Sequence, residues 1–149
     1  MTSTQVDVAA MDGYEQLMAT GEGLIPGAPI AETLGMVNFG GERGAITVEL
    51  DPEVRHYNPI GVVHGGVIST LLDTAAGCSV HSTLKPGEGY TSLDLTVKFL
   101  RPVTTESGRL KAVGQVLQRG RRTSLAQAQL FDGSGKLVAH ATSSCMIFA

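Results

Sequence analysis

The stretch Asn58 to Gly77, which reads NPIGVVHGGVISTLLDTAAG, decides the fold of this chain. Its apolar residues recur at helical spacing, and the pattern predicts a helix over about 64–82, the only strong helical signal in the sequence. Two glycines open this helix, and one acid, Asp73, lies two turns further in. From His64 to Leu84 there is no Lys, Arg, Glu or Gln. A helix without such side chains is expected to be buried.

The predicted helix has two different faces at about 100° per residue. The apolar face, which we expect to pack on a sheet, consists of Val67, Ile68, Leu71, Leu72, Ala75 and Cys78. The opposite face surrounds Asp73 with small residues, namely Gly66, Ser69, Thr70, Ala76 and Gly77. Small side chains allow a partner helix or a substrate to approach the backbone closely. For Asp73 itself, the alternative is a surface acid, or a buried one bonded to nearby hydroxyls.

The remainder of the chain is dominated by strand patterns. We expect a short helix at 11–20, strands at 31–39 and 43–50, and a period-two strand in TSLDLTVKFLRP, which begins at Thr91. Three further strands are predicted in GRLKAVGQVLQ, TSLAQAQLFD and KLVAHATSSCMIF. Antiparallel strands around one long helix predict an α+β domain in which the sheet wraps the helix. Because one helix covers only one face, the other is solvated or pairs with another copy.

Length and composition restrict the class of protein. The 149 residues predict a single domain, 1–149, with an N-terminal helix and loop in 1–28 and a core in 29–149. A formal net charge of −3 argues against nucleic acid as a partner. The longest uncharged run, 57–72, is shorter than the ~20 residues of a bilayer span, and the N-terminus carries no secretory pattern. With two isolated cysteines, we expect a cytoplasmic protein without a membrane partner.

The glycine end of the helix is a candidate site for an oxygen atom. The first N–H groups of a helix have no intrahelical partner and lie at the positive end of its dipole. Gly65 and Gly66 lack a Cβ, so an anion or a polarised carbonyl oxygen can approach their amides. The alternative is that the glycines serve only a tight turn from loop to helix.

The spacing between the two features constrains any site that uses both. Gly65 and Asp73 are eight residues apart, which is about 12 Å along one helix. If both act on one bond, they come from different subunits whose helices pass each other in opposite directions. A two-fold dimer would then contain two identical sites.

Asn58, the VHGG motif at 63–66 and Asp73 together resemble the hotdog-fold acyl-CoA thioesterases, in particular the phenylacetic-acid-degradation type and the related 4-hydroxybenzoyl-CoA type. The resemblance covers nearly the whole chain, from PIAETLGM at 29–36 to the last strand. It implies a sheet wrapped around a central helix, dimers that often pair into tetramers, and hydrolysis of an acyl-CoA thioester. No cofactor is implied, because CoA is part of the substrate.

The resemblance also implies roles for single residues. The Gly65 amide would polarise the thioester carbonyl, and Asn58 would orient the substrate. Asp73 of the facing subunit would act as general base or as nucleophile, roles between which the family divides. Ser92 would help to place the attacking water, although a strand serine is often structural. Some relatives carry Glu at the position of Asp73 and a hydroxyl residue at that of Gly77, and the shorter acid favours base chemistry through water.

Further residues are candidates for substrate binding. His64 and Gly66 belong to the motif, where the histidine is mainly structural. For the CoA phosphates the candidates are Arg101 and the turn RGRRT at 119–123, with Arg121, Arg122 and Thr123. A solvated hairpin turn is the alternative for that segment. The other histidines share no ligand spacing, so no metal is expected.

Two other functions are compatible with this fold. A non-catalytic acyl-CoA-binding or sensing protein would use the same pocket, but retention of Asp73 favours chemistry. A hotdog dehydratase or hydratase would need a histidine-led segment, and we find none in this sequence.

Overall fold

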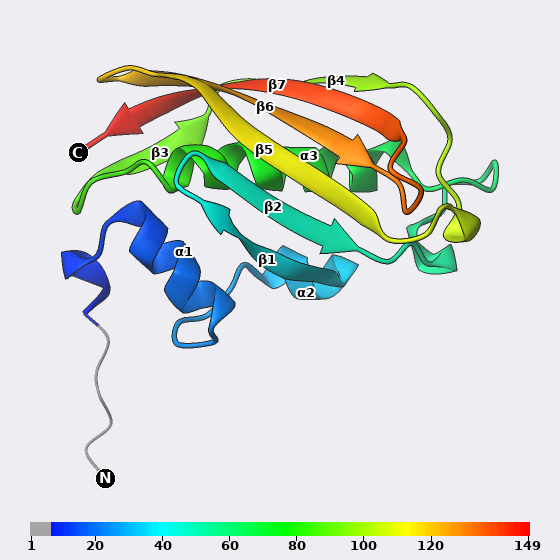
Figure 1. Cartoon of the computed structure of the whole chain (residues 1–149), viewed down its shortest axis with the longest axis horizontal. Coiled ribbons are helices and arrows are strands. Elements are labelled where there is room, and N and C mark those ends of the chain that lie inside the picture. Colours follow the sequence, from blue (N-terminus) through cyan, green and yellow to red (C-terminus); the bar gives the residue numbers. More distant parts are fainter. Residues whose placement is uncertain (1–6) are drawn as a thin grey trace, which may run out of the picture.

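The computed structural model describes residues 7–149 and shows a seven-stranded antiparallel sheet wrapped around one long helix (Figure 1). The helices are α1 (Gly13–Gly21), α2 (Pro29–Leu34) and α3 (Gly65–His81). The strands are β1 (Met36–Glu42), β2 (Ala45–Leu50), β3 (Gly89–Ser92), β4 (Thr96–Phe99), β5 (Leu110–Arg119), β6 (Thr123–Phe131) and β7 (Leu137–Phe148). The sheet order is β1-β2-β5-β6-β7-β3, and β4 also pairs with β7. The predicted α+β architecture is confirmed.

Helix α3 begins and ends close to the predicted residues. The side chain of His64 caps its start, because the Nδ1 atom accepts a 2.7 Å hydrogen bond from the Gly66 N–H. At the other end, Ser82 continues the last turn and its N–H donates to Cys78 O. The His64 cap and the helical spacing of the apolar residues together explain why the predicted bounds of this helix agree with the structure.

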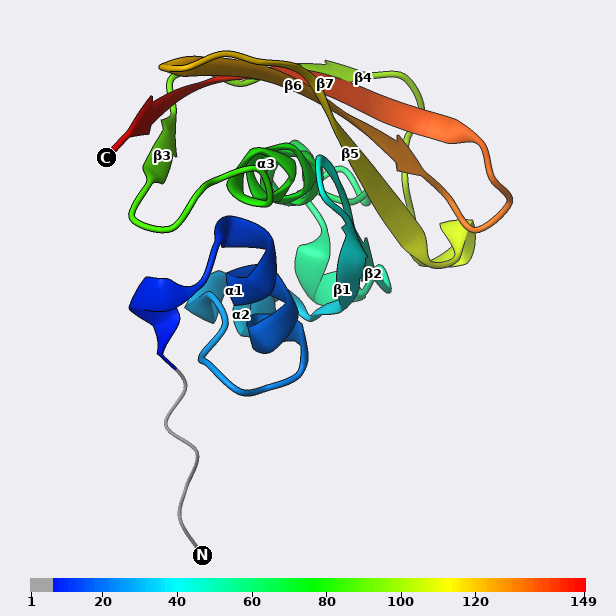
Figure 2. The ribbon, with the colours of Figure 1, turned by 60° about the vertical axis from the view of Figure 1, so that its left-hand side comes forward.

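The sheet curves around α3 and buries its apolar face (Figure 2). Ile68, Leu71 and Ala75 are at most 4% exposed, within a core shared with β2, β5, β6 and β7. The Ser79 hydroxyl donates to Ala75 O at 2.7 Å and accepts from the Ile46 N–H at 2.9 Å. This bond fixes the helix to β2, so the helix and the sheet form one packed unit.

Two predictions about strands were wrong. Residues 29–34 form α2 instead of the start of a strand, because Pro29 occupies the first turn and Gly35 ends the helix with φ 80°. The segment predicted as one strand from Thr91 forms β3 and β4. Asp94 causes the break, since its carboxylate accepts from the Ser144 N–H of β7 at 2.7 Å. Five strands therefore follow α3, where four were expected.

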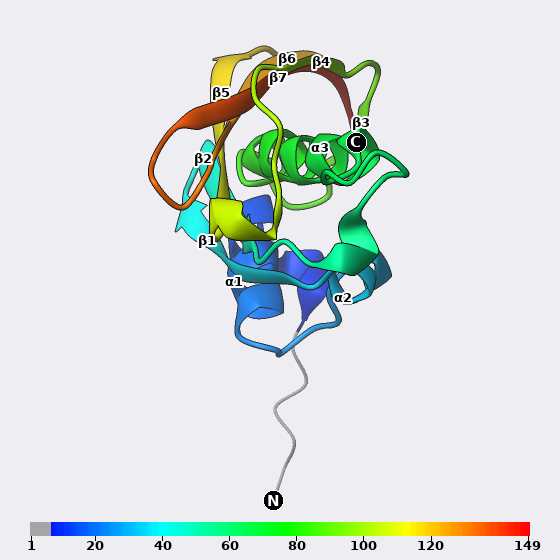
Figure 3. The ribbon, with the colours of Figure 1, turned by 90° about the vertical axis from the view of Figure 1, so that its right-hand side faces the viewer.

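Helix α1 covers part of the open side of the curved sheet. It contacts β1 and α3, and the end-on view shows it on the side of α3 away from β6 and β7 (Figure 3). A capping box between Asp12 and Glu15 begins this helix. Gly13 donates its N–H to Leu84 O at 2.9 Å, which ties α1 to the end of α3. The predicted N-terminal helix is thus confirmed and helps to enclose the space beside α3.

Gly114 of β5 should not tolerate a side chain. A Cβ there would lie 2.1 Å from Ala75 O and 2.4 Å from Ser79 Oγ. We predict that Gly114→Ala lowers the free energy of unfolding by at least about 2 kcal/mol, measured by urea denaturation. Gly40→Ala is the matched control, because a Cβ there meets no heavy atom within 4 Å among the described residues. Equal stability of the two variants would contradict this account of the packing.

Candidate active site

The glycine end of α3 opens into a cavity of about 340 Å³, which we call the glycine cavity. Asn58, Gly65 and Arg101, three of the predicted site residues, all line it. The ring of Phe99 lies over the helix terminus, and a Cβ at Gly65 would come within 3.0 Å of its Cζ atom. The absence of a side chain at position 65 therefore lets the ring lie this close to the helix terminus.

Two donors at the glycine cavity are free to bind a ligand. The Gly66 N–H is engaged by His64, whereas Gly65, at the first helical position, has no intrahelical acceptor for its N–H. The Oδ1 atom of Asn58 accepts from the Ile60 and Val62 N–H groups at 3.1 and 3.2 Å. These bonds leave the Nδ2 group of Asn58 without a partner within residues 7–149, so this amide can donate to a carbonyl oxygen.

Asp73 lies half-buried in the middle of α3. Burial raises the pKa of its carboxyl above the ordinary value, and a hydrogen bond from Ser92 partly offsets the rise. Ser92 lies on β3, as does Tyr90, whose hydroxyl is 3.2 Å from where a Cβ of Gly77 would be. Ser92 and Tyr90 are two residues apart on β3, and Asp73 and Gly77 are one turn apart on α3. Both spacings are about 6 Å, so Ser92 lies beside Asp73 and Tyr90 lies beside Gly77.

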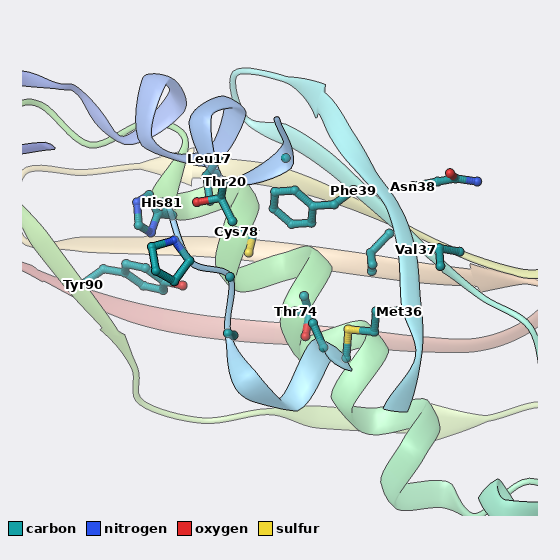
Figure 4. Close-up of a pocket in the computed structure, with 16 residues that line it drawn as sticks. Leu17, Thr20, Met36, Val37, Asn38, Phe39, Thr74, Cys78, His81 and Tyr90 are labelled. Carbon is teal, nitrogen blue, oxygen red and sulfur yellow. The ribbon is translucent and has the colours of Figure 1, made fainter. Parts of the chain in front are cut away.

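A larger cavity of about 760 Å³ adjoins the acid and is called the α1 cavity here (Figure 4). It lies between α1, the loop before α2, β1, α3 and β3. Its apolar lining includes Leu17, Met36, Val37, Phe39, Val48 and Cys78. Thr74 follows Asp73 in the chain and lines this cavity, and the charge of Asp73 helps to raise the pKa of both Cys78 and Tyr90. Asp73 therefore lies beside three residues of the cavity wall, although it does not line the cavity itself.

The α1 cavity contains residues that the sequence analysis did not identify. Thr74, Tyr90 and the residues of β1 were not predicted to belong to a site. Cys78 was expected to pack on the sheet, but it lines the cavity instead. Burial and the nearby Asp73 raise the pKa of its thiol to about 12, so it stays protonated. No local signal marked this cavity, because none of the small residues around Asp73 lines it.

The two halves of the predicted site do not meet within one chain. Gly65 and Asp73 lie on the same helix, and the glycine cavity and the α1 cavity share no lining residue. Gly65 lines only the glycine cavity and Asp73 lines neither, so the backbone donor and the acid share no cavity within one chain.

The basic turn between β5 and β6 is exposed. Arg119 is held by Glu88 at 2.9 Å and by Thr83, whereas Arg121 and Arg122 form no ion pair within residues 7–149. Thr123 lines a third cavity of about 320 Å³, with Ser124 and Ser144. Arg101 lies apart from this turn, in the glycine cavity. The candidates for CoA binding are thus divided between two places.

Within 7–149, no group of three or more His, Cys, Asp and Glu side chains is arranged to hold a metal ion. No helix in that part of the chain is both long and apolar enough to cross a bilayer.

Comparison with known proteins agrees with this geometry. The family model of the thioesterase superfamily matches residues 60–139, just over half of the chain and a segment that includes α3 and most of the sheet. The chain belongs to this superfamily and has its hotdog fold. It is a thioester hydrolase.

Three relatives are similar over most of their length. The medium/long-chain acyl-CoA thioesterase YigI of Escherichia coli K12 is 27% identical, over 93% of this chain and 98% of its own. The 1,4-dihydroxy-2-naphthoyl-CoA hydrolase of Listeria monocytogenes is 25% identical, over 73% and 87%. The crystal structure of a phenylacetic acid degradation-related protein from Ralstonia eutropha JMP134 superposes with a TM-score of 0.79 at 31% identity, over 87% and 98%. The resemblance to the phenylacetic-acid-degradation type is confirmed.

The hydrogen bond from Ser92 should be visible in the titration of Asp73. Because this bond stabilises the carboxylate, Ser92→Ala should raise the pKa of Asp73 further above its ordinary value. Carbon-13 NMR of the Asp73 carboxyl would measure this shift directly. Thr91→Ala, on the neighbouring residue of β3, is the control and should leave the titration unchanged. A pKa that stays constant or falls in Ser92→Ala would contradict the assignment.

Proposed function

We propose that this protein is an acyl-CoA thioesterase, which hydrolyses an acyl-CoA to the free acid and CoA. The observation that carries this proposal is the half-buried Asp73, with its raised pKa, beside an apolar cavity of about 760 Å³. A carboxyl whose pKa is raised toward neutrality is a stronger base than an exposed one, and the cavity supplies space for an acyl group.

In the proposed reaction, the thioester oxygen binds at the glycine cavity. The Gly65 N–H and the Asn58 amide donate to this oxygen and stabilise the negative charge that develops on it. Asp73 removes a proton from water, the resulting hydroxide attacks the thioester carbon, and the C–S bond breaks. CoA leaves as a thiolate and takes up a proton.

A nucleophilic role for Asp73 is the alternative step. Its carboxylate would attack the thioester carbon and form an anhydride, which water would then hydrolyse. The short aspartate side chain favours the general-base role, because it leaves room for an ordered water. In that case Ser92 helps to place the water as well as the carboxylate.

The site requires a second copy of the chain. The glycine cavity and Asp73 face separate spaces in one protomer, so we place Gly65 and Asn58 of one protomer opposite Asp73 of its partner. Apolar side chains at the glycine cavity support this arrangement, since Phe99 and Leu100 line it and are each 55% exposed. A two-fold dimer would cover them and complete two sites, and such dimers could pair into a tetramer.

The CoA moiety would extend to the basic residues. Arg121, Arg122 and Thr123 at the β5–β6 turn are exposed, and Arg101 lies at the glycine cavity. Free guanidinium groups are suited to phosphate oxygens. A non-catalytic acyl-CoA-binding protein would use the same contacts, and the role of Asp73 distinguishes it from the enzyme. We expect the enzyme to act in the cytoplasm.

Asp73→Asn tests the catalytic assignment. Loss of the carboxylate should reduce kcat/KM for acyl-CoA hydrolysis at least about 100-fold, measured by release of the CoA thiol. The fold should persist. Because the pKa of Asp73 is raised by folding, the protein loses stability as the pH rises through that pKa, so the variant at pH 7 should melt at or above the wild-type temperature. Full turnover in Asp73→Asn would exclude this residue as base or nucleophile.

A complementation experiment tests the shared site. Asp73→Ala and Asn58→Ala chains should each be inactive as homodimers. After mixing under conditions that exchange subunits, the heterodimers would contain one intact site, and about a quarter of the wild-type activity should return. Asn58→Ala mixed with itself is the control. If exchange is shown by mass spectrometry and no activity returns, the two residues do not act across an interface.

A further inference from the structure

We propose that the α1 cavity is built for an acyl group that carries an oxygen atom, and that the Tyr90 hydroxyl donates a hydrogen bond to this oxygen about one helical turn beyond the thioester carbon. The inference rests on the proposed function, which places the thioester carbon next to Asp73. It adds a substrate class, the oxygenated acyl-CoAs, and a residue that selects it.

The ring of Tyr90 is held firmly in the wall of the cavity. It packs edge-on against His81, with 5.4 Å between the ring centroids and an interplanar angle of 76°. His81 in turn is held by Gln16 of α1, 2.9 Å from its Nε2 atom. Figure 4 shows Tyr90 and His81 side by side at one end of the cavity. The hydroxyl is therefore preorganised by its neighbours before a ligand binds.

Tyr90 lines the α1 cavity, and its hydroxyl lies beside Gly77 of α3. The absence of a side chain at Gly77 allows this close approach, since a Cβ there would lie 3.2 Å from the hydroxyl oxygen and 3.6 Å from Cε2. Gly77 is one turn from Asp73, or about 6 Å. An acyl group crosses that distance in about four or five bonds. An oxygen near the fifth carbon of the acyl group would thus reach Tyr90.

The hydroxyl also lacks a hydrogen-bond partner among the described residues. Among the polar side chains that line the cavity, Thr20, Asn38 and His81 are hydrogen-bonded to other residues. Tyr90 and Thr74 make no side-chain hydrogen bond within residues 7–149. Thr74 follows Asp73, next to which the thioester carbon would lie. The Tyr90 hydroxyl, in contrast, lies beside Gly77, one helical turn further along α3. A purely hydrocarbon chain would bury the Tyr90 hydroxyl unpaired, which costs free energy.

Tyr90 would act as a donor throughout the physiological range. Burial, with the nearby Cys78, Cys145 and Asp73, raises the pKa of its phenol, so the proton is retained. A protonated phenol can donate to a ketone, ester or hydroxyl oxygen of the acyl group. A site that is built to hydrogen-bond a substrate oxygen discriminates strongly against the analogue that lacks it.

The test compares two substrates of equal length, 5-oxohexanoyl-CoA and hexanoyl-CoA. The wild-type enzyme should hydrolyse the oxo substrate with a kcat/KM about 10-fold higher. Tyr90→Phe should remove this preference by slowing only the oxo substrate, and Gly77→Ala should weaken it by pressing on the hydroxyl. Tyr14→Phe is the matched control, because that hydroxyl donates to Gly41 O at 2.9 Å and does not line the cavity.

The outcomes separate this inference from the proposed function. Equal rates for both substrates in the wild type, or an equal loss on both in Tyr90→Phe, would overturn the role of Tyr90 while thioester hydrolysis stands. Failure of the wild type to hydrolyse either substrate, or any acyl-CoA, would overturn the proposed function and this inference with it. Thermal melting of each variant verifies that the fold is retained.

Discussion

Burial of α3 against the concave face of the sheet is the constraint on which the rest of this molecule depends. The helix backbone lies so close to β5 that only glycine fits at position 114, and Ser79 bonds the helix to β2. With its apolar face fixed in this way, the helix has no freedom to rotate. The side of the helix that carries Asp73 and Gly77 is consequently turned toward β3, and Thr74, Cys78 and His81 face the α1 cavity.

A rigid helix explains how one element supplies two different chemical groups. The N-terminus offers a backbone donor at Gly65, in an environment that Phe99 and the Asn58 loop define. Two turns further on, the helix offers a desolvated acid. These groups are fixed about 12 Å apart, so they cannot converge on one bond by side-chain motion. Because of this fixed distance, each site in the proposed dimer combines Gly65 of one protomer with Asp73 of its partner. The two-fold axis then produces two complete sites.

The burial that makes Asp73 a stronger base also lowers the stability of the folded protein. Burial makes the carboxyl a better base and also makes its ionised form unfavourable in the folded protein. The hydrogen bond from Ser92 limits this penalty without removing it. Around the acid, Cys78 and Tyr90 both retain their protons. Of these three neighbouring groups, Asp73 is the one that can accept a proton.

The sequence by itself determined the long helix, its apolar face, its glycine start and the position of its acid. These features depend on the spacing of residues and on capping within one segment, so they can be predicted from that segment alone. It did not predict α2, since the short helix depends on its two end residues, Pro29 and Gly35, nor the break at Asp94, which depends on the Ser144 backbone of a distant strand. Only the tertiary structure brought Tyr90, Thr74 and β1 together around the α1 cavity, because their separation along the chain leaves no local pattern.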